Sequence, residues 1–559
     1  MSPLFLRSTG HLRGDLFGGI TAAIVALPLA LAFGVASGAG AVAGLYGAIA
    51  VGFFAALFGG TPSQISGPTG PMSVIMSTVF AALMLQHPNQ GTALAFTVVM
   101  FSGLFQILFG VFKLGRYITL MPYTVISGFM SGIGFIILII QVAPLLGYPI
   151  GANVLTSLRG IPAALAQPNW AATGIGILTL LIVFGSPPRL NRIIPSPLLA
   201  LVVCTVVSII AFPRGAMPRI DDIPQSLPHL QLPAFTLDQL PLMIGYGLIL
   251  AALGSIDSIL TSLVADNLTQ TQHDSDRELI GQGIGNLIAG LFGGLPGAGA
   301  TMRTVINIKA GGRTPLSGMI HAVVLLGIVL GAGPLTSQIP HAVLAGILIK
   351  VGVDIVDWGF LRRAHRISHK TTGIMYLVLI LTVFVDLVTA VAVGVFIANV
   401  LTLERLSKIQ QQQVQLITTA AEAFHLAPEE QTLLAQAQNR ILLFQLGGAM
   451  SFGAARSIAQ RMGMIERYDV LILDFSPVLF LGVTASLAVE TMVKTAVSKG
   501  RSVFLVGARG EVSDRLHRLE IFQYLPPEQR VSDRLEALQQ AVAQIKPAPF
   551  CSLDSRQRS

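Results

Sequence analysis

Residues 55–62 read Ala-Ala-Leu-Phe-Gly-Gly-Thr-Pro, and residues 289–296 read Ala-Gly-Leu-Phe-Gly-Gly-Leu-Pro. Each copy ends an apolar segment and precedes a short stretch rich in glycine and polar residues, after which another apolar segment begins. Two such matched stretches indicate an internal duplication. In membrane proteins, paired interrupted helices in corresponding halves of a chain are the best sequence pointer to a substrate site.

The composition indicates that most of the chain lies in lipid. The 559 residues are 53% hydrophobic and only 11% charged, whereas soluble domains carry roughly a quarter charged residues. Apolar runs long enough to span a bilayer recur from Gly14 to Leu403, and the remainder has the composition of a soluble protein. We predict a membrane domain over 1–405, a linker and helix over 406–439, a soluble domain over 440–545 and a tail over 546–559.

The apolar segments number about fourteen, seven in each half, and 71–85 and 303–309 are too short to span a bilayer alone. Seven segments per half place the halves in opposite orientations, so we predict an inverted repeat. The first-half segments are 14–37, 41–59, 71–85, 92–112, 120–146, 171–186 and 195–212. The second-half segments are 241–265, 279–293, 303–309, 315–333, 340–352, 371–386 and 387–403.

Basic residues gather in the loops on one predicted side of the membrane. The loops of the other side hold few of them, such as Arg159 and Arg219. By the positive-inside rule, both termini are expected in the cytoplasm, at an inner or plasma membrane. The basic residues of the predicted inner loops include Lys113, Arg116, Arg362, Arg363, Arg366 and Lys370.

The two interruptions predict an anion site. Half-helices that begin near residues 71 and 302 would each present free N–H groups and roughly +0.5 elementary charge. If inverted symmetry brings the two starts together, they form a site for an anion. Thr69 and Thr301 stand just before these starts and can add hydroxyl donors. The alternative is that the glycines and prolines only loosen helix packing, and the matched pair favours the site.

Asp257 is the candidate cation ligand because it lies inside the apolar segment 244–264. A carboxylate in a membrane costs ~2.5–3.5 kcal/mol on insertion scales and is a functional candidate by default. Thr261 follows one helical turn later, so both side chains share a face. With the free carbonyls of a broken helix, they offer hard oxygen ligands for a cation or proton. The alternative is a structural aspartate bonded to a serine such as Ser258.

Arg303 stands at the start of the second half-helix, where a cation opposes the helix dipole. We interpret it as an anion-binding or charge-balancing residue. The alternatives are a cytoplasm-facing basic residue and a partner for Asp257. His321 and Gln106 also lie in apolar runs, and we interpret them as helix–helix hydrogen bonders.

The C-terminal part has a different pattern. Residues 404–415 form a polar, glutamine-rich linker, and 416–439 are predicted to be helical. After Arg440, strand-like and helical runs alternate, which is typical of an α/β domain. The expected strands are 441–446, 470–475 and 502–506, and the expected helices are 453–467, 484–499 and 512–519.

Three stretches carry a resemblance to a known family: residues 14–19, residues 66–70, and the Arg303 stretch with residues 311–314. They resemble the sulfate permease (SulP) family, anion transporters with a C-terminal STAS domain, over nearly the whole chain. The resemblance implies a mainly α membrane fold with a seven-plus-seven inverted repeat, and a cytosolic α/β STAS domain. It also implies a core domain that bears the site, a gate domain, elevator-like movement and a homodimer.

Within the family, residues 26–34, 121–129 and 256–266 are most similar to the cyanobacterial sodium-dependent bicarbonate transporters. We therefore expect sodium-coupled bicarbonate uptake by secondary active transport. At Arg303 that branch carries a small residue and other branches a basic one, so proton-coupled sulfate or dicarboxylate transport stays the alternative. The implied sodium-site residues are Asp257, Thr261, Gly299 and Thr301, and the implied anion-site positions are Thr69 and Ala300.

Residues 440–545 resemble a STAS domain. Anti-sigma factor antagonists of that family place a phosphorylatable serine after an aspartate, whereas here Thr484 takes the place of the serine and Gly482 that of the aspartate. We expect a regulatory or dimer-forming module in which Thr484 is the regulatory position but is not phosphorylated.

The remaining expectations concern partners and chemistry. Neither a metal-ligand cluster nor a nucleophile motif is found, so we expect no enzyme, no catalytic residue and no cofactor apart from sodium as the coupling ion. The expected partners are an inorganic anion, sodium, the lipid bilayer and a second copy of the chain, but no nucleic acid. A membrane-anchored STAS signalling protein is the remote alternative, which the two intact interrupted segments disfavour.

Overall fold

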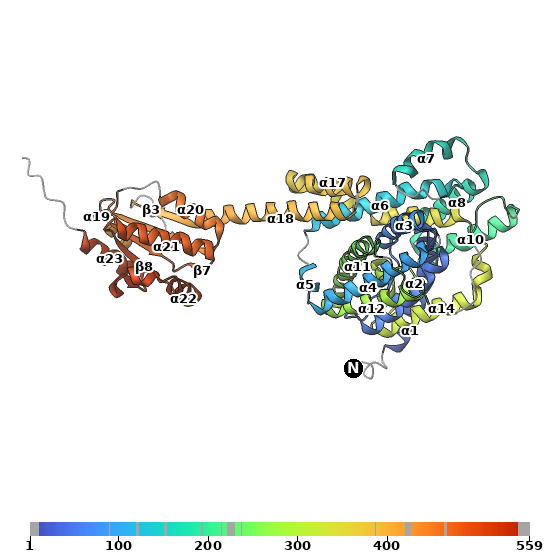
Figure 1. The fold of residues 1–559 in the computed structure, drawn as a ribbon, viewed down its shortest axis with the longest axis horizontal. Helices are drawn as coiled ribbons and strands as arrows, with labels where there is room; N and C mark the ends of the chain where they lie inside the picture. The colour runs from blue at the N-terminus through green and yellow to red at the C-terminus, as the bar shows by residue number, and fades with distance from the viewer. Residues whose placement is uncertain are drawn as a thin grey trace, which may run out of the picture. The chain divides into compact units, whose positions relative to one another are not determined.

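The computed structural model divides into two compact units, residues 1–398 and 399–559, and each is described by itself (Figure 1). The expected tail, 546–559, lies outside the described residues. The structure describes residues 11–88, 90–118, 122–149, 154–191, 194–213, 215–220, 230–235, 237–385, 387–419, 426–462 and 467–545.

The helices of the first unit follow the expected apolar segments, because each of the fourteen predicted ranges has a helix in its place. In the first half these are α1 (Leu12–Ala36), α2 (Ala41–Phe58), α3 (Gly70–Gln86), α4 (Gly91–Val111), α6 (Tyr123–Leu145), α8 (Trp170–Gly185) and α10 (Ser196–Ala211). In the second half they are α11 (Leu240–Thr269), α12 (Ser275–Leu291), α13 (Thr301–Lys309), α14 (Pro315–Thr336), α15 (His341–Ile355), α17 (His369–Phe384) and α18 (Leu387–Gln412).

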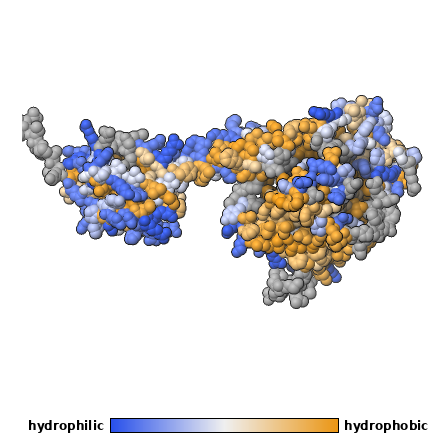
Figure 2. Space-filling model, viewed as in Figure 1, coloured by the Kyte–Doolittle hydropathy of each residue, from blue (hydrophilic) through white to orange (hydrophobic). Residues whose placement is uncertain are grey.

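The described helices have the length and composition of a membrane domain. Six are long and apolar enough to cross a membrane, or seven if α7 (Val154–Ala166) and α8, which meet at 110°, form one span. Shorter apolar helices, among them α3 and α10, accompany them. Large apolar side chains such as Phe17, Leu181 and Ile210 are exposed on this unit, and Figure 2 shows broad apolar areas over its surface.

Two groups of helices pack within the first unit. In one group α1, α2, α4, α11, α12 and α14 contact one another, and α3 and α13 join it through α4, α1 and α11. In the other, α6 packs against α15 and α17, and α8 against α10 and α15. The groups meet where α1 contacts α10 and α15 and where α3 contacts α6 (Figure 1). This is the division into core and gate that the sequence resemblance implies.

Glycine allows the closest of these contacts. Where α4 and α12 cross, a Cβ atom on Gly103 would lie 2.5 Å from the Gly283 carbonyl oxygen, and one on Gly283 would lie 2.6 Å from the Gly103 carbonyl oxygen. Small residues let helix backbones approach in this way inside membranes, where association depends on close packing. The α4–α12 contact fixes the helix that leads into the second interruption.

The second unit is an α/β domain around a five-stranded sheet with the order β3-β4-β6-β8-β9, whose edge strands are β3 (Val414–Ile417) and β9 (Arg530–Val531). Its parallel centre confirms the predicted strands as β4 (Ile441–Leu446), β6 (Val470–Asp474) and β8 (Ser502–Val506). Leu442 and Phe444 point into the core beside α20 (Phe452–Met462) and α21 (Val483–Ser498), and Leu443 points into a second core on the opposite face. The central strands are apolar on both faces because both faces are covered.

One prediction in this unit is wrong. The range 416–439, expected to be helical, contains strand β3 (Val414–Ile417), antiparallel to β4, and a shorter helix, α19 (Pro428–Gln436). Residues 420–425 lie outside the described part. A four-residue strand next to a glutamine-rich run is too short to show a clear period of two. Most of the expected linker, 404–415, is the C-terminal part of α18.

A buried ionic cluster joins both ends of the second unit to its sheet. Arg534, at the start of α23 (Arg534–Gln544), bonds Glu430 of α19 through Nε at 2.9 Å and through Nη2 at 3.0 Å. Its Nη1 bonds Asp474 at the end of β6, also at 3.0 Å. Asp474 is fully buried, and a buried carboxylate is tolerated only when it is paired.

We therefore expect Arg534→Gln to destabilise this unit by about 2–4 kcal/mol, because Asp474 and Glu430 stay buried without their cation. Hydrogen exchange on the full-length protein should show faster exchange in β6 and α19. Arg440→Gln is the matched control, because its pair with Asp469 is exposed and worth roughly 0–1 kcal/mol. Equal exchange in the two variants would contradict the role of Arg534.

Candidate functional site

Two short strands meet at the point where the chain is interrupted twice. β1 (Ser66–Gly67) pairs antiparallel with β2 (Ala298–Gly299). The Ala300 N–H extends this pairing by donating to the Ile65 carbonyl at 2.8 Å. Helices α3 and α13 begin just after β1 and β2. The two breaks thus supply backbone partners for each other, and a helix N-terminus flanks each end of the crossing.

Side chains from three helices hold the second strand. Asn286 of α12 accepts from the Gly297 N–H at 2.7 Å and donates to the Gly297 carbonyl at 2.9 Å. The same amide nitrogen donates to Gln106 of α4 at 2.6 Å. Ser258 of α11 accepts from the Gly299 N–H at 3.0 Å. Backbone groups that lack a helical partner here are therefore satisfied by side chains, as a membrane interior requires.

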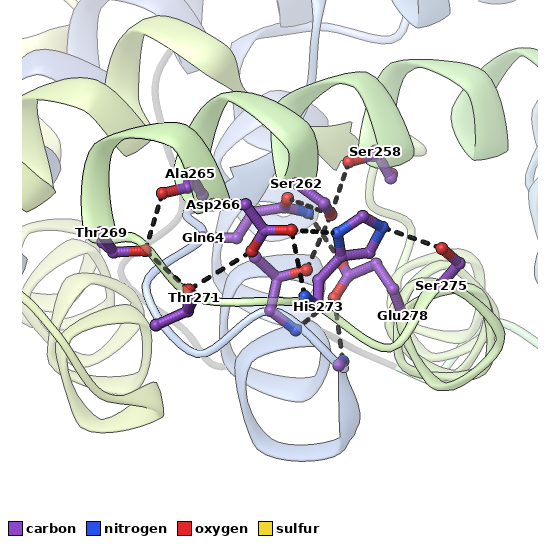
Figure 3. Close-up of polar contacts among 12 residues, drawn as sticks. Gln64, Ser258, Ser262, Ala265, Asp266, Thr269, Thr271, His273, Ser275 and Glu278 are labelled. Atoms are coloured by element: carbon purple, nitrogen blue, oxygen red, sulfur yellow. Dashed lines mark hydrogen bonds and ion pairs between the residues drawn. The ribbon is translucent and has the colours of Figure 1, made fainter. Parts of the chain in front are cut away.

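A further polar network holds the segment before β1 (Figure 3). Glu278 of α12 is buried and accepts from the N–H groups of Gly60 and Thr61, both at 2.9 Å. Gln64 donates to Glu278 at 2.7 Å and accepts from Ser262 of α11 at 3.0 Å. Glu278 thus satisfies backbone N–H groups just after the end of α2, and it links the first interruption to α11 and α12.

The turn between α11 and α12 is fixed by three side chains that sequence reasoning did not single out (Figure 3). His273 Nδ1 lies 2.6 Å from Asp266 Oδ2, and His273 Nε2 lies 2.8 Å from Ser275 Oγ. The types and spacing of Asp266, His273 and Ser275 match no pattern that predicts a site in a membrane protein. These three side chains fix the point at which α12 begins, and they therefore fix the position of Glu278.

Oxygen atoms gather where α11 passes the crossing. Thr261 Oγ1 donates to the Gly299 carbonyl at 3.0 Å and lies 2.8 Å from Thr301 Oγ1. Asp257, one turn earlier on α11, is 8% exposed. The structure therefore brings three of the four expected sodium-site residues into contact and places the fourth on the same helix face. One carboxylate, one carbonyl and two hydroxyls form a donor set for a hard cation.

The start of α3 carries a hydroxyl without a partner. Thr69 occupies the N-cap position of α3 and is buried, and among the described residues its Oγ1 has no hydrogen-bond partner. Burying an unpaired hydroxyl costs free energy, so a ligand at this point would gain that bond. The Asp257 carboxylate interacts with this hydroxyl from beyond hydrogen-bond distance, so the hydroxyl stays available to a ligand.

The start of α13 differs from that of α3. The Ala300 N–H is already bonded to Ile65, so Ala300 can contact a ligand only through its carbon atoms. The first in-helix donor is Thr304, which bonds the Ala300 carbonyl at 2.8 Å. The N–H groups of the preceding turn therefore have no partner within the helix. Thr301, the first residue of this turn, is exposed.

Arg303 is buried beside the crossing, with 2% of its surface exposed. Its Nη2 donates to the Pro68 carbonyl at 2.6 Å. Gly67 leaves room for the guanidinium, because a Cβ atom there would lie 2.8 Å from Arg303 Nη1. The charge of Arg303 acts on Asp257, although no ion pair joins them in the described part of the chain. Arg303 thus supports the chain between β1 and α3 and does not extend into a cytoplasmic loop.

Gln106 and His321 were both expected to form hydrogen bonds between helices, and within the described part of the chain only one of them does. Gln106 accepts a hydrogen bond from Asn286 on a neighbouring helix, as expected. The interpretation of His321 is wrong: it is fully buried, and neither ring nitrogen has a partner among the described residues. The ring packs against Gly52 of α2, where a Cβ atom would lie 3.6 Å from Nε2.

A narrow cleft, with room for little more than one water molecule, opens beside the start of α3. Its walls come from α1 and α3 on one side and from α6 and α15 on the other. The lining is mostly apolar, with Ser73, Ser77 and Gln141 as its polar side chains. Since these helices belong to the two different groups, the cleft lies between core and gate.

In the second unit, Thr484 is exposed at the start of α21, two residues after the N-cap Gly482. An added negative charge at this position would meet the positive end of the helix dipole. The regulatory role of Thr484 stays a prediction.

Comparison with known proteins agrees with both units. The model of the sulfate permease family matches residues 12–378, and that of the STAS domain matches residues 432–536. The chain is 53% identical to the bicarbonate transporter BicA of a Synechocystis species, over 96% of this chain and 95% of the relative. It is 31% identical to the putative sulfate transporter YvdB of Bacillus subtilis, over 86% and 88% of the two chains.

Solved structures support the same arrangement. The transmembrane domain of a cyanobacterial bicarbonate transporter BicA is 55% identical and matches with a TM-score of 0.65, over 68% of this chain and 98% of that chain. The murine anion transporter Slc26a9 in its inward-facing state is 19% identical and matches with a TM-score of 0.81, over 96% of this chain and 93% of that chain. The second likeness shows the fold alone.

We expect Asn286→Ala to lower stability by about 2–3 kcal/mol, because it leaves both backbone groups of Gly297 buried without partners. Hydrogen exchange at residues 297–301 should rise more than elsewhere in the first unit. Asn286→Asp keeps the acceptor for the Gly297 N–H but loses the donor, so it should give an intermediate effect. Unchanged exchange in Asn286→Ala would show that the strand pair holds itself.

Proposed function

The chain belongs to the sulfate permease family of anion transporters, and on that premise we propose that it takes up bicarbonate together with sodium ions. As a multi-pass membrane protein with paired half-helices, it has the architecture in which secondary transporters bind substrates. The observation that carries the proposal is the pairing of β1 with β2, which places the starts of α3 and α13 at its two ends, beside an oxygen-rich cluster on α11. The similarity to a bicarbonate transporter along 96% of the chain supports the choice of anion.

We assign sodium to the cluster on α11. The carboxylate of Asp257, the hydroxyls of Thr261 and Thr301 and the Gly299 carbonyl would surround it. The ion would replace the hydroxyl–hydroxyl contact between Thr261 and Thr301, so those groups need to move little. The single carboxylate then has its charge balanced, which a buried carboxylate needs.

We assign bicarbonate to the space between the two helix starts. The hydroxyl of Thr69 offers an unused donor, and the first N–H groups of α3 and α13 offer others. Ala300 would line this space through its methyl group. Anions bind readily at helix N-termini for these reasons.

Charge balance explains why the two ions would bind together. The two helix N-termini contribute roughly one positive charge, and Asp257 removes about one when it is ionised. Bound sodium restores the positive charge, so the site then favours a monovalent anion. Arg303 adds a buried positive charge that acts on Asp257, and its main part in this proposal is to position the start of α3 through the Pro68 carbonyl.

Movement and assembly follow the family resemblance. The cleft between core and gate is where an elevator-like shift of the core would open the site to one side and then the other. We propose that both termini are cytoplasmic, in the inner or plasma membrane, that the membrane domain ends near residue 405, and that the protein is a dimer. The STAS domain would regulate transport or support dimerisation.

The alternative is uptake of sulfate or a dicarboxylate. The buried charge of Arg303 favours it, because one further positive charge would suit a divalent anion. Purified protein in liposomes should take up labelled bicarbonate only when sodium is present outside, and excess sulfate should compete weakly. Sulfate uptake that is faster than bicarbonate uptake, or bicarbonate uptake that ignores sodium, would favour the alternative.

Asp257→Asn should abolish sodium-driven uptake and leave the fold intact, because it keeps the volume and removes the charge that binds the cation. We expect the sodium-driven initial rate to fall to background, because the site loses its only charged ligand. Asp354→Asn, which removes an exposed carboxylate from α15, is the control and should transport normally. Sodium-driven uptake by a well-folded Asp257→Asn protein would remove Asp257 from the site.

Arg303→Gln should test the buried arginine, because it removes the charge and keeps a donor for the Pro68 carbonyl. We expect it to lower the affinity for divalent anions more than for bicarbonate and to make uptake depend more strongly on sodium, because the site then lacks the positive charge of Arg303. Arg313→Gln, an exposed position in the loop after α13, removes the same charge and should change neither. Identical selectivity and sodium curves in wild type and Arg303→Gln would limit Arg303 to a structural role.

A further inference from the structure

A short amphipathic helix, α16 (Trp358–Ile367), joins α15 to α17 in the gate. Phe360 and Ala364 are buried and pack against Met375 of α17. Arg362, Arg363 and Arg366 are exposed on the remaining surface. The apolar face of α16 is thus covered by protein, and its basic face is left exposed.

The start of α16 is fixed to α6. The carboxylate of Asp357 accepts from the Phe360 N–H at 3.0 Å and from the hydroxyls of Tyr123 and Ser127, both at 2.8 Å. Burial would raise the pKa of Asp357, but these hydrogen bonds and the charge of Arg363 outweigh it and hold that pKa below its usual value. The Phe360 ring also packs edge-on against Tyr123, with centroids 5.2 Å apart. These contacts fix the start of α16 against α6.

The neighbouring helix ends place α16 at a membrane surface. α15 ends just before it, and α6 and α17 begin beside it and just after it. Trp358 is 40% exposed and Tyr123 59% exposed, and such aromatic residues prefer the level of the lipid headgroups. The side chain of Ile367 is 64% exposed, and at a membrane surface it would contact the lipid acyl chains.

The charge of this segment is strongly one-sided. Over residues 357–370 the only acidic residue is Asp357, against four basic residues, so the net charge is +3. Among the described residues no ion pair engages Arg362, Arg363 or Arg366. The guanidinium group bonds phosphate oxygens in pairs, which makes arginine the preferred residue at such contacts. The four basic residues are Arg362, Arg363, Arg366 and Lys370.

We propose that α16 is a binding surface for anionic lipid headgroups, which hold the gate against the membrane. The three arginines of α16 and Lys370 at the start of α17 form a cluster of four basic residues, and such clusters next to membrane helices bind anionic lipids at the cytoplasmic leaflet, so the proposal rests on the topology proposed above. It goes beyond the positive-inside rule, because that rule requires basic residues in the loop but no lipid bound to them. The gate then stays fixed in the bilayer while the core moves.

The test uses the fluorescence of Trp358. The chain has two tryptophans, so Trp170→Phe leaves Trp358 on α16 as the only reporter. The full-length protein is reconstituted in phosphatidylcholine vesicles that contain a small share of brominated phosphatidylglycerol or, separately, of brominated phosphatidylcholine. We expect the anionic lipid to quench Trp358 at roughly tenfold lower mole fraction than the neutral lipid.

Charge-removal variants complete the test. In the Trp170→Phe background, replacing Arg362, Arg363 and Arg366 by glutamine should bring the two quenching curves together. The matched control replaces Arg456, Arg509 and Arg518 of the soluble unit by glutamine and should keep the preference. Equal quenching by both lipids in the unaltered segment would overturn the proposal. Absence of quenching by either lipid would also overturn it and show that protein covers this face.

Discussion

The structure depends on a requirement of the polypeptide backbone in lipid: an N–H or C=O group that leaves a helix inside a membrane must find another partner. Neither interruption can meet this requirement alone. β1 and β2 meet it together by pairing with each other. The side chain of Asn286 then satisfies Gly297, and Ser258 satisfies the Gly299 N–H. The two halves of the membrane domain are therefore joined at the one place where each is incomplete.

The polar groups at this crossing are the ones that would bind the two ions. Two helix starts, the unused hydroxyl of Thr69 and the oxygens around Thr261 lie within a small part of the core. Asp257 is a carboxylate that needs a cation, and the helix starts attract an anion. Each ion therefore improves the surroundings of the other. In the proposed mechanism, sodium and bicarbonate are coupled because they share this crossing.

The sequence was sufficient for the duplication, the positions of the apolar segments and the three central strands, because each has a periodic or repeated pattern. It was not sufficient for the bonds of Glu278 to Gly60, Thr61 and Gln64, which lie more than 200 residues away in the chain. The orientation of the Arg303 side chain could not be predicted, because it depends on the space left by Gly67. Helix α16 was not predicted, because it is short and charged and therefore lacks the apolar run of a membrane span. Strand β3 was missed because four residues do not establish a period.

The most direct test of the shared site is the reciprocity of binding. Calorimetry on the purified protein would give the bicarbonate affinity with and without sodium, and the sodium affinity with and without bicarbonate. Two ions that couple through one site must change each other's affinity by the same factor, and we expect an increase of roughly 5- to 150-fold in both directions. A bicarbonate affinity that does not depend on sodium would contradict a joint site at the crossing of β1 and β2.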